Sequence, residues 1–143
     1  MSTVIKVKRL RPRARLPFRA SEGATGLDLY ACLDEPLTIG RDVTLVPSGV
    51  AIETPAGFDV QIRPRSGLSR QGVNVILGTI DADYRGELLV SMHTFGSRES
   101  YEIKDGDRIA QLVITRFELI ELEEADELSD SLRGDGGHGS TGR

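Results

Sequence analysis

The chain has 143 residues, 38% of them hydrophobic and 28% charged, which fits one folded domain and disfavours a disordered or two-domain protein. Its formal net charge of −4 gives the molecule as a whole no general affinity for polyanions such as nucleic acids. A single cysteine and 2 histidines exclude an intramolecular disulfide and a structural zinc site, so any metal ion must be bound through oxygen.

The N-terminal arm, residues 1–19, is strongly basic and lacks the apolar central segment that a secretory signal requires. No later stretch reaches the roughly 18 apolar residues of a membrane span. We therefore expect a cytoplasmic protein that does not contact membranes. A second charged segment, at residues 118–130, is acidic. The basic residues of the arm are typical of a solvated surface or of salt bridges between chains, and the alternative is a nucleic-acid-binding arm.

Apolar and polar residues alternate through most of the chain, which is the period of β-strands. Turn-forming Gly, Pro, Asp and Ser residues interrupt the alternation often enough to keep each strand short. This pattern predicts an all-β protein, a jelly roll, β-sandwich or barrel. The expected strands lie at 5–7, 27–31, 37–39, 43–45, 50–52, 58–62, 73–77, 88–92 and 101–103.

One short helix is expected at 66–71, with Ser66 as its N-cap and Gly72 just after its end. From residue 129 the sequence changes to Ser, Asp, Arg and Gly, which cannot bury enough apolar surface to become ordered alone. We therefore expect a β domain over residues 1–128 and a mobile glycine-rich tail over residues 129–143.

Two of these regions could bind phosphate. Around Arg65, the start of the short helix would present N–H groups to an anion, and the alternative is an ordinary polar turn. In the tail, glycine N–H groups, Arg133 and the hydroxyls of Ser140 and Thr141 could wrap an oxyanion, or the tail could be a generic linker. The G-x-G-x-x-G spelling at 134–139 is not a dinucleotide motif, because neither a strand nor a helix flanks it.

Acidic residues mark two further candidates. Residues 78–87 form an expected hairpin that carries two aspartates and Tyr84, and three charges beside this tyrosine are more than a turn requires. Asp28 lies on an apolar strand, where the alternative interpretation is a position that simply faces solvent.

The order of these segments is more specific than any one of them, and together they resemble the homotrimeric dUTPase family. The resemblance runs over nearly the whole chain. Five segments carry it, in this order: Ala24-Thr25-Gly26-Leu27-Asp28-Leu29, Pro64-Arg65-Ser66-Gly67-Leu68, residues 78–86, Gly106-Asp107-Arg108-Ile109-Ala110-Gln111-Leu112, and residues 133–142.

The resemblance implies a β-jelly-roll subunit, a homotrimer with active sites shared between chains, and Mg²⁺-assisted hydrolysis of dUTP. Water would attack the α-phosphate and give dUMP and pyrophosphate, which keeps uracil out of DNA and supplies dUMP for thymidylate synthesis. Asp81 would hold the attacking water and contact the sugar 3′-hydroxyl, and Gln111 would help place the water or the α-phosphate. Asp28 would reach Mg²⁺ through coordinated water.

The resemblance also implies a set of residues that bind the nucleotide. Arg65, Ser66 and Gly67 would clamp the phosphates, and the tail would close as a lid over the γ-phosphate through Arg133, Gly139, Ser140 and Thr141.

Selection of the base would come from hairpin backbone groups. Those at Gly78, Thr79, Ile80 and Leu89 would pair with uracil, and a site built for such hydrogen bonds leaves its groups unpaired with cytosine. Tyr84 would pack beneath the deoxyribose and exclude a 2′-hydroxyl.

Two positions depart from the family pattern. His138 stands where a Phe is usual, and it would stack on uracil in that role. Val75 stands where many relatives have Asn, so its contacts with the nucleotide would be limited to the backbone.

Two alternatives stay open at this stage. A dCTP deaminase shares the fold, but its usual signature has Glu where this chain has Asp81, together with a different Arg-Ser segment. A nucleic-acid-binding β-module that uses the basic arm would show affinity that falls steeply with salt, and it leaves the five segments unexplained.

Overall fold

The computed structural model describes residues 3–139, and nearly all of its regular structure is β. The expectation of an all-β protein with one short helix is confirmed. The strands are β1 (Lys6–Arg9), β2 (Leu27–Tyr30), β3 (Leu37–Ile39), β4 (Thr44–Pro47), β5 (Val50–Glu53), β6 (Phe58–Arg63), β7 (Val73–Val75), β8 (Gly78–Ile80), β9 (Leu89–Thr94), β10 (Tyr101–Ile103) and β11 (Arg108–Arg116), and the helix is α1 (Ser66–Arg70).

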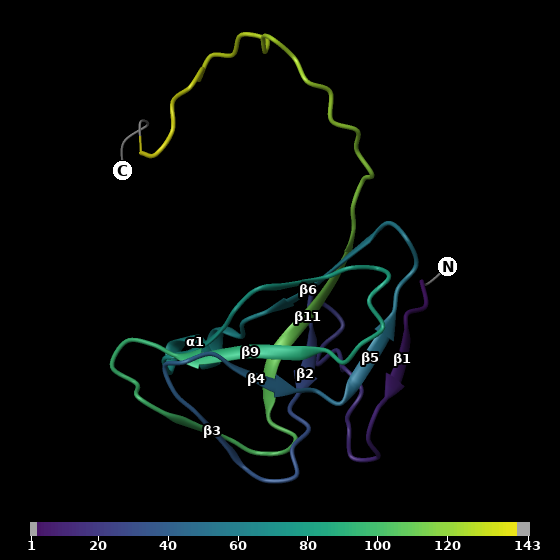
Figure 1. The fold of residues 1–143 in the computed structure, drawn as a ribbon, viewed down its shortest axis with the longest axis vertical. Helices are drawn as coiled ribbons and strands as arrows, with labels where there is room; N and C mark the ends of the chain where they lie inside the picture. The colour runs from purple at the N-terminus through teal and green to yellow at the C-terminus, as the bar shows by residue number, and fades with distance from the viewer. Residues whose placement is uncertain (1–2, 140–143) are drawn as a thin grey trace.

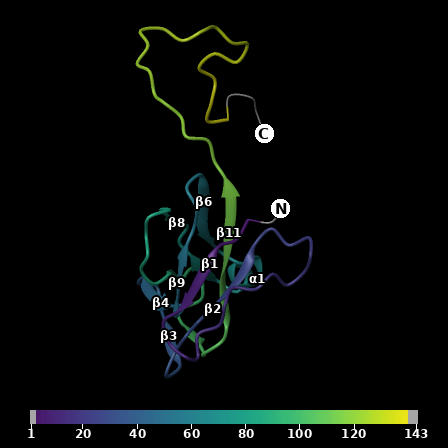
Figure 2. The same ribbon diagram turned by 90° about the vertical axis from the view of Figure 1, so that its right-hand side faces the viewer.

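The strands form a sandwich of short antiparallel sheets (Figures 1 and 2). A four-stranded sheet has the order β2-β11-β6-β8, and a three-stranded sheet has the order β4-β9-β7. The pairs β1-β5 and β10-β3 complete the fold. Inward side chains of both larger sheets, among them Ile62, Leu112, Val90 and Met92, are buried in one hydrophobic core. With so few aromatic residues, branched aliphatic side chains supply most of this burial.

Four details differ from the sequence expectation. The first is β8, which was expected to be part of a hairpin at 78–87 and instead pairs with β6. The pattern missed β11, because neighbouring residues of this strand are buried in pairs, Ile109 with Ala110 and Leu112 with Val113, and its apolar residues do not alternate. Leu77 lies outside β7 and is 56% exposed, although it was expected on that strand. Ser66 is the first helical residue and not the N-cap; Arg65 takes the cap position and makes no side-chain cap bond.

After β11 the chain leaves the sandwich. Residues 117–139 form no helix or strand, and the ribbon arches away from the sheets (Figures 1 and 2). Leucines along this segment are almost fully exposed, Leu122 to 92%. Within the described residues, we find no helix with the length and apolar character needed to cross a membrane.

The basic arm is tied to its own chain. Arg13 donates to the carbonyl of Leu33 at 2.8 Å and lies 3.4 Å from Asp34. Arg15 lies over the Tyr30 ring, 5.8 Å from its centroid. These cations therefore have partners within the subunit, an arrangement that the sequence interpretation did not include.

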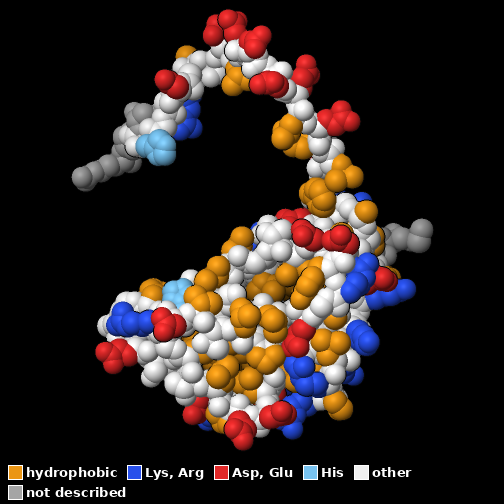
Figure 3. Space-filling view, viewed as in Figure 1, with side chains coloured by type: hydrophobic (Ala, Val, Ile, Leu, Met, Phe, Trp, Pro, Cys, Tyr) orange, Lys and Arg blue, Asp and Glu red, His pale blue; other side chains and the backbone are white. Residues whose placement is uncertain are grey.

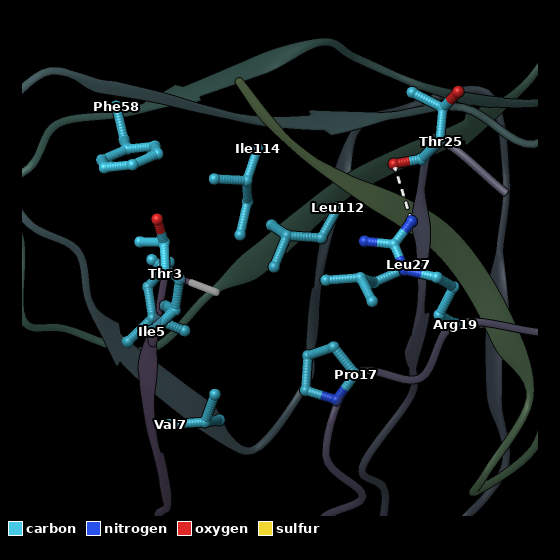
Figure 4. A pocket seen from close by; sticks show the side chains of 11 residues that line it. Thr3, Ile5, Val7, Pro17, Arg19, Thr25, Leu27, Phe58, Leu112 and Ile114 are labelled. Carbon is cyan, nitrogen blue, oxygen red and sulfur yellow. Dashed lines mark hydrogen bonds between the residues drawn. The ribbon is translucent and has the colours of Figure 1, made fainter. Parts of the chain in front are cut away.

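A mostly apolar cavity of about 360 Å³ opens between the N-terminal segment and strands β2 and β11 (Figure 4). Leu27 and Leu112 line it, next to Asp28 and Gln111 in sequence. Because successive side chains of a strand point to opposite faces, the two polar residues face away from this cavity.

Candidate active site

The first group of candidate residues surrounds the Asp28 carboxylate, which is 15% exposed and so does not simply face solvent. The guanidinium of Arg65 lies 3.8 Å from Asp28 Oδ1, and that of Arg108 lies 3.6 Å from Oδ2. Arg65 also donates to the carbonyl of Arg108 at 3.0 Å. Two guanidinium groups against one carboxylate leave an excess of positive charge, which suits a polyphosphate.

Strand register aligns this group. Gln111 of β11 pairs with Asp28 on β2 and with Arg63 on β6, so polar side chains from three neighbouring strands share one face of the sheet. The Gln111 side chain donates to the carbonyl of Pro64 at 2.9 Å, just before the helix. The pattern of the sequence did not assign a role to Arg108, and its place in the fourth of the five segments was the signal available.

Gly26 leaves the space that the Gln111 side chain occupies. A Cβ at residue 26 would lie 2.3 Å from Gln111 Oε1 and 3.1 Å from its Cβ. We expect Gly26→Ala to displace the Gln111 amide from Pro64 and to lower turnover about 10- to 100-fold, because misplacement of a positioning group by about 1 Å has effects of that size. The melting temperature should change little, since the displaced amide is at the surface of the sheet. Steady-state kinetics with thermal unfolding measures both, and unchanged turnover would contradict the role of Gln111.

The second group lies on the connection between β8 and β9. β8 pairs with β6, whereas β9 pairs with β4 and β7, so this connection joins two sheets and the expected two-stranded hairpin is not formed. We keep the name hairpin for this connecting loop. A pocket of about 200 Å³ is lined by Thr79, Ile80, Asp81, Tyr84 and Leu89, together with Glu87. β8 is the edge strand of its sheet in the described part of the chain, so one row of its backbone N–H and C=O groups is available to a ligand. The Asp81 side chain is exposed, and its carbonyl accepts the Tyr84 N–H at 3.0 Å to form the turn.

An ion pair anchors the base of this hairpin. Arg11 donates through both terminal nitrogens to Glu87, at 3.2 and 2.6 Å. Burial raises the pKa of Glu87, but the hydrogen bonds from Arg11 and from the Gly49 N–H, with the charge of Arg11, outweigh it and lower this pKa below its ordinary value. The hydrogen bond to Glu87 raises the pKa of Arg11. Both groups are therefore charged at neutral pH.

Other predicted residues fall next to these groups. Ser66 and Gly67 are exposed at the start of α1, beside Arg65, and the buried Leu68 fixes the helix to the core. Val75 lies on β7 with 2% of its surface exposed, so its side chain belongs to the core and only its backbone could contact a nucleotide.

The tail holds the remaining candidates away from both groups. Arg133 donates to the carbonyl of Gly136 within the tail itself, and Figure 3 shows the tail separated from the sandwich. His138 has a positive φ of 50°, and Gly139 follows with a φ of 86°. Ser140 and Thr141 lie outside the described residues.

A single chain does not bring the three groups together. Asp28 lies on one edge strand of the four-stranded sheet and the hairpin begins on the other edge, three strand spacings away. At ~4.8 Å per spacing this is about 14 Å.

The Asp28 group does not fit a metal ion held by protein ligands alone. Among the described residues, no cluster of three or more His, Cys, Asp or Glu side chains could hold an ion. The guanidinium groups of Arg65 and Arg108 would also repel a bare cation. An ion that arrives on the phosphates of a nucleotide and keeps its waters does fit, because Mg²⁺ is usually bound in this way.

Comparison with known proteins gives one consistent result. The sequence model of the dUTPase family matches residues 13–142. The chain is 50% identical over 140 residues to a deoxyuridine 5′-triphosphate nucleotidohydrolase of Hydrogenobaculum sp., covering 95% of this chain and 96% of the relative. It is 45% identical to the Rickettsia felis protein of the same name, covering 98% of this chain and 97% of that protein.

Among solved structures, the Staphylococcus bacteriophage 80alpha dUTPase with dUPNHPP superposes with a TM-score of 0.88 at 29% identity, covering 99% of this chain and all of that one. The jelly-roll-like β-sandwich expected from the sequence is confirmed by this superposition.

Proposed function

The chain belongs to the dUTPase family and hydrolyses dUTP, and from this premise we propose that water attacks the α-phosphate and that dUMP and pyrophosphate leave. This activity keeps uracil out of DNA and supplies dUMP for thymidylate synthesis. The observation that carries the proposal is the exposed Asp81 carboxylate beside the 200 Å³ pocket of the β8–β9 hairpin.

In the proposed reaction, Asp81 accepts a hydrogen bond from the nucleophilic water and orients it. As the water oxygen bonds to the α-phosphorus, its proton passes to the Asp81 carboxylate, and the bond between that phosphorus and the bridging oxygen breaks. The amide of Gln111 helps to place the water or the α-phosphate. Positioning and charge stabilisation supply most of the rate increase in such phosphoryl chemistry.

We assign the triphosphate to the positive group on the sheet face. Arg65, with Ser66 and Gly67, holds the phosphates, and the tail brings Arg133, Gly139, Ser140 and Thr141 over the γ-phosphate. Mg²⁺ bound to the triphosphate would neutralise charge on the phosphate oxygens, with Asp28 contacting its waters. The excess positive charge between Arg65 and Arg108 supports this assignment.

Uracil and the sugar are assigned to the hairpin. Backbone groups of Gly78, Thr79, Ile80 and Leu89 pair with the base. The first three lie on β8, an edge strand in the described part of the chain, and Leu89 lines the same pocket from β9. The backbone of Val75 supplies any contact at that position, and His138 stacks on the uracil ring. Tyr84 lies beneath the sugar.

Tyr84→Ala should weaken discrimination against UTP more than it slows dUTP cleavage, because it opens space where a 2′-hydroxyl would lie. The ring is 43% exposed and is held by the hydrogen bond from its hydroxyl to the carbonyl of Glu87 at 2.8 Å. Tyr84→Phe keeps the ring but loses this hydrogen bond, so it should retain more discrimination than Tyr84→Ala and separates the bulk of the ring from the effect of the bond. Competition kinetics with UTP and dUTP measures the ratio, and an unchanged ratio in Tyr84→Ala would refute the role.

We propose a homotrimer whose active sites each draw on three chains. The separation of Asp28, the hairpin and the tail within one subunit supports this arrangement. A second support is the apolar surface over β4 and β9 (Figure 3), where Leu45 and Leu89 are 56% and 40% exposed. An apolar face of this kind is typical of a surface that another subunit covers.

The direct test of function is pyrophosphate release from dUTP, compared with dCTP, dTTP and UTP, with and without Mg²⁺. Of these four nucleotides, we expect only dUTP to release pyrophosphate, and we expect this release to be faster with Mg²⁺. Ammonia release from dCTP would instead indicate a deaminase. The trimer is tested independently by light scattering of the purified protein.

A further inference from the structure

The basic N-terminal arm contacts the hairpin that carries Asp81 and Tyr84. The guanidinium of Arg11 forms a two-pronged contact with the Glu87 carboxylate, at 3.2 and 2.6 Å. The same carboxylate accepts the N–H of Gly49 at 2.9 Å. Donors from two remote parts of the chain thus converge on one side chain at the base of the hairpin, and we call Arg11, Glu87 and Gly49 the hairpin clamp.

The backbone of Glu87 continues this connection toward the candidate site. Its carbonyl accepts the Tyr84 hydroxyl at 2.8 Å, and the Tyr84 N–H donates to the carbonyl of Asp81 at 3.0 Å. Gly86 allows the tyrosine to fold back, because a Cβ there would lie 2.4 Å from the Tyr84 hydroxyl oxygen. Hydrogen bonds at Glu87 and Tyr84, linked by the covalent structure of these two residues, therefore connect Arg11 to the turn that presents Asp81.

Gly49 is fixed in the clamp by its backbone and by packing. Its φ is 73°, in the left-handed region that favours glycine. A Cβ would lie 2.7 Å from the Cβ of Ala14 and 2.8 Å from the Sγ of Cys32. The Gly49 carbonyl accepts the N–H of Leu10 at 2.8 Å, so the same residue holds both the arm and the hairpin.

The hairpin stays attached to the fold by contacts outside the clamp. Leu88 is fully buried, and its N–H donates to the carbonyl of Val50 at 2.9 Å. Arg85, nearer the tip, pairs with Glu53 at 3.4 Å, but both side chains are about half exposed, at 50% and 49%. The Arg11 and Glu87 side chains are less exposed, at 39% and 20%, where a charged hydrogen bond is less screened by water. Loss of the clamp should therefore loosen the turn without unfolding the sandwich.

We propose that Arg11 and Glu87 are positioning residues for the dUTPase reaction, which hold the 81–86 turn in the geometry that Asp81 and Tyr84 require. The proposal rests on the function proposed above and gives the basic arm a role within the subunit. A bidentate contact requires the planar fork of an arginine, so lysine at residue 11 would restore the charge but only part of the geometry.

The test compares Arg11→Met, Arg11→Lys and Glu87→Gln with Glu53→Gln, the matched control that removes the exposed ion pair of the same hairpin. We expect Arg11→Met to lower kcat for dUTP about 10- to 100-fold and to reduce discrimination against UTP, with a smaller change in KM. Arg11→Lys should recover part of the kcat. Glu87→Gln keeps an oxygen for the Gly49 N–H, and it should fold and show the same direction of change. Glu53→Gln should stay within about twofold of the parent, because exposed ion pairs contribute little.

Hydrogen exchange of the peptide spanning residues 78–90 gives a readout that does not depend on catalysis. In Arg11→Met and Glu87→Gln, we expect faster exchange at 81–87 and unchanged exchange at β6 and β11. Parent-like kcat in both variants, or lowered kcat with unchanged exchange in this peptide, would overturn the proposal. Absence of dUTP cleavage by the parent would instead refute the proposed function, and the exchange measurement would still show whether the clamp orders the turn.

Discussion

Replacing Asp81 by Asn should lower the turnover of dUTP by about 10²- to 10⁴-fold, the range expected when a group that accepts a proton in the transition state is lost. Asparagine preserves the size of the side chain and can still hydrogen-bond to water, but it cannot take the proton from the nucleophile. The Asp81 side chain is exposed, and only its backbone carbonyl is used in the turn with Tyr84. The fold and the binding of dUTP should therefore be retained.

Asp83→Asn is the matched control for this variant. Asp83 lies two residues further along the same loop, is also exposed, and loses the same charge on substitution. It should retain turnover within about threefold, because it has no proposed contact with the reacting atoms. Rapid-quench measurement of pyrophosphate, with dUTP affinity from calorimetry, separates chemistry from binding. Turnover of Asp81→Asn within threefold of the parent would remove Asp81 from its role.

A second large effect is expected when two inactive variants are mixed, because activity should then be recovered. Chains with Asp81→Asn and chains that lack residues 129–143 should each be inactive as homotrimers, yet regain activity when unfolded and refolded together. If the hairpin and the tail of one site come from different chains, about a quarter of the sites in an equimolar random mixture contain an intact copy of both. The exposure of the tail beyond β11 indicates that its removal leaves the core unchanged.

The control mixture pairs Asp81→Asn chains with chains that carry both defects. It should stay inactive, since no chain then supplies an intact Asp81. Native mass spectrometry must establish that mixed trimers form in each case. Mixed trimers without recovered activity would mean that hairpin and tail act within one chain, and would reject the shared site without affecting the assignment to the dUTPase family.

The sequence alone determined the fold class and the family. Alternation of apolar and polar residues is a local property of a strand with one buried face, so most strands were predicted close to their observed positions. The five ordered segments identified the family, which the comparisons support over residues 13–142. The central strand β11 was missed because adjacent residues along it are buried together and its apolar residues do not alternate.

Only the tertiary structure decided which of these residues meet. Asp28 is brought to Gln111 by the register between β2 and β11, and to Arg65 by the chain direction after β6. Arg11 and Glu87 are 76 residues apart in sequence, and neither has a local pattern that predicts the other. Local periodicity reports which face of a strand is buried, whereas strand order and register depend on the packing of the whole core. For this reason most residues of the candidate site could be predicted from the sequence. Only the structure showed that Arg108 lies beside Asp28 and that the clamp lies at the base of the hairpin.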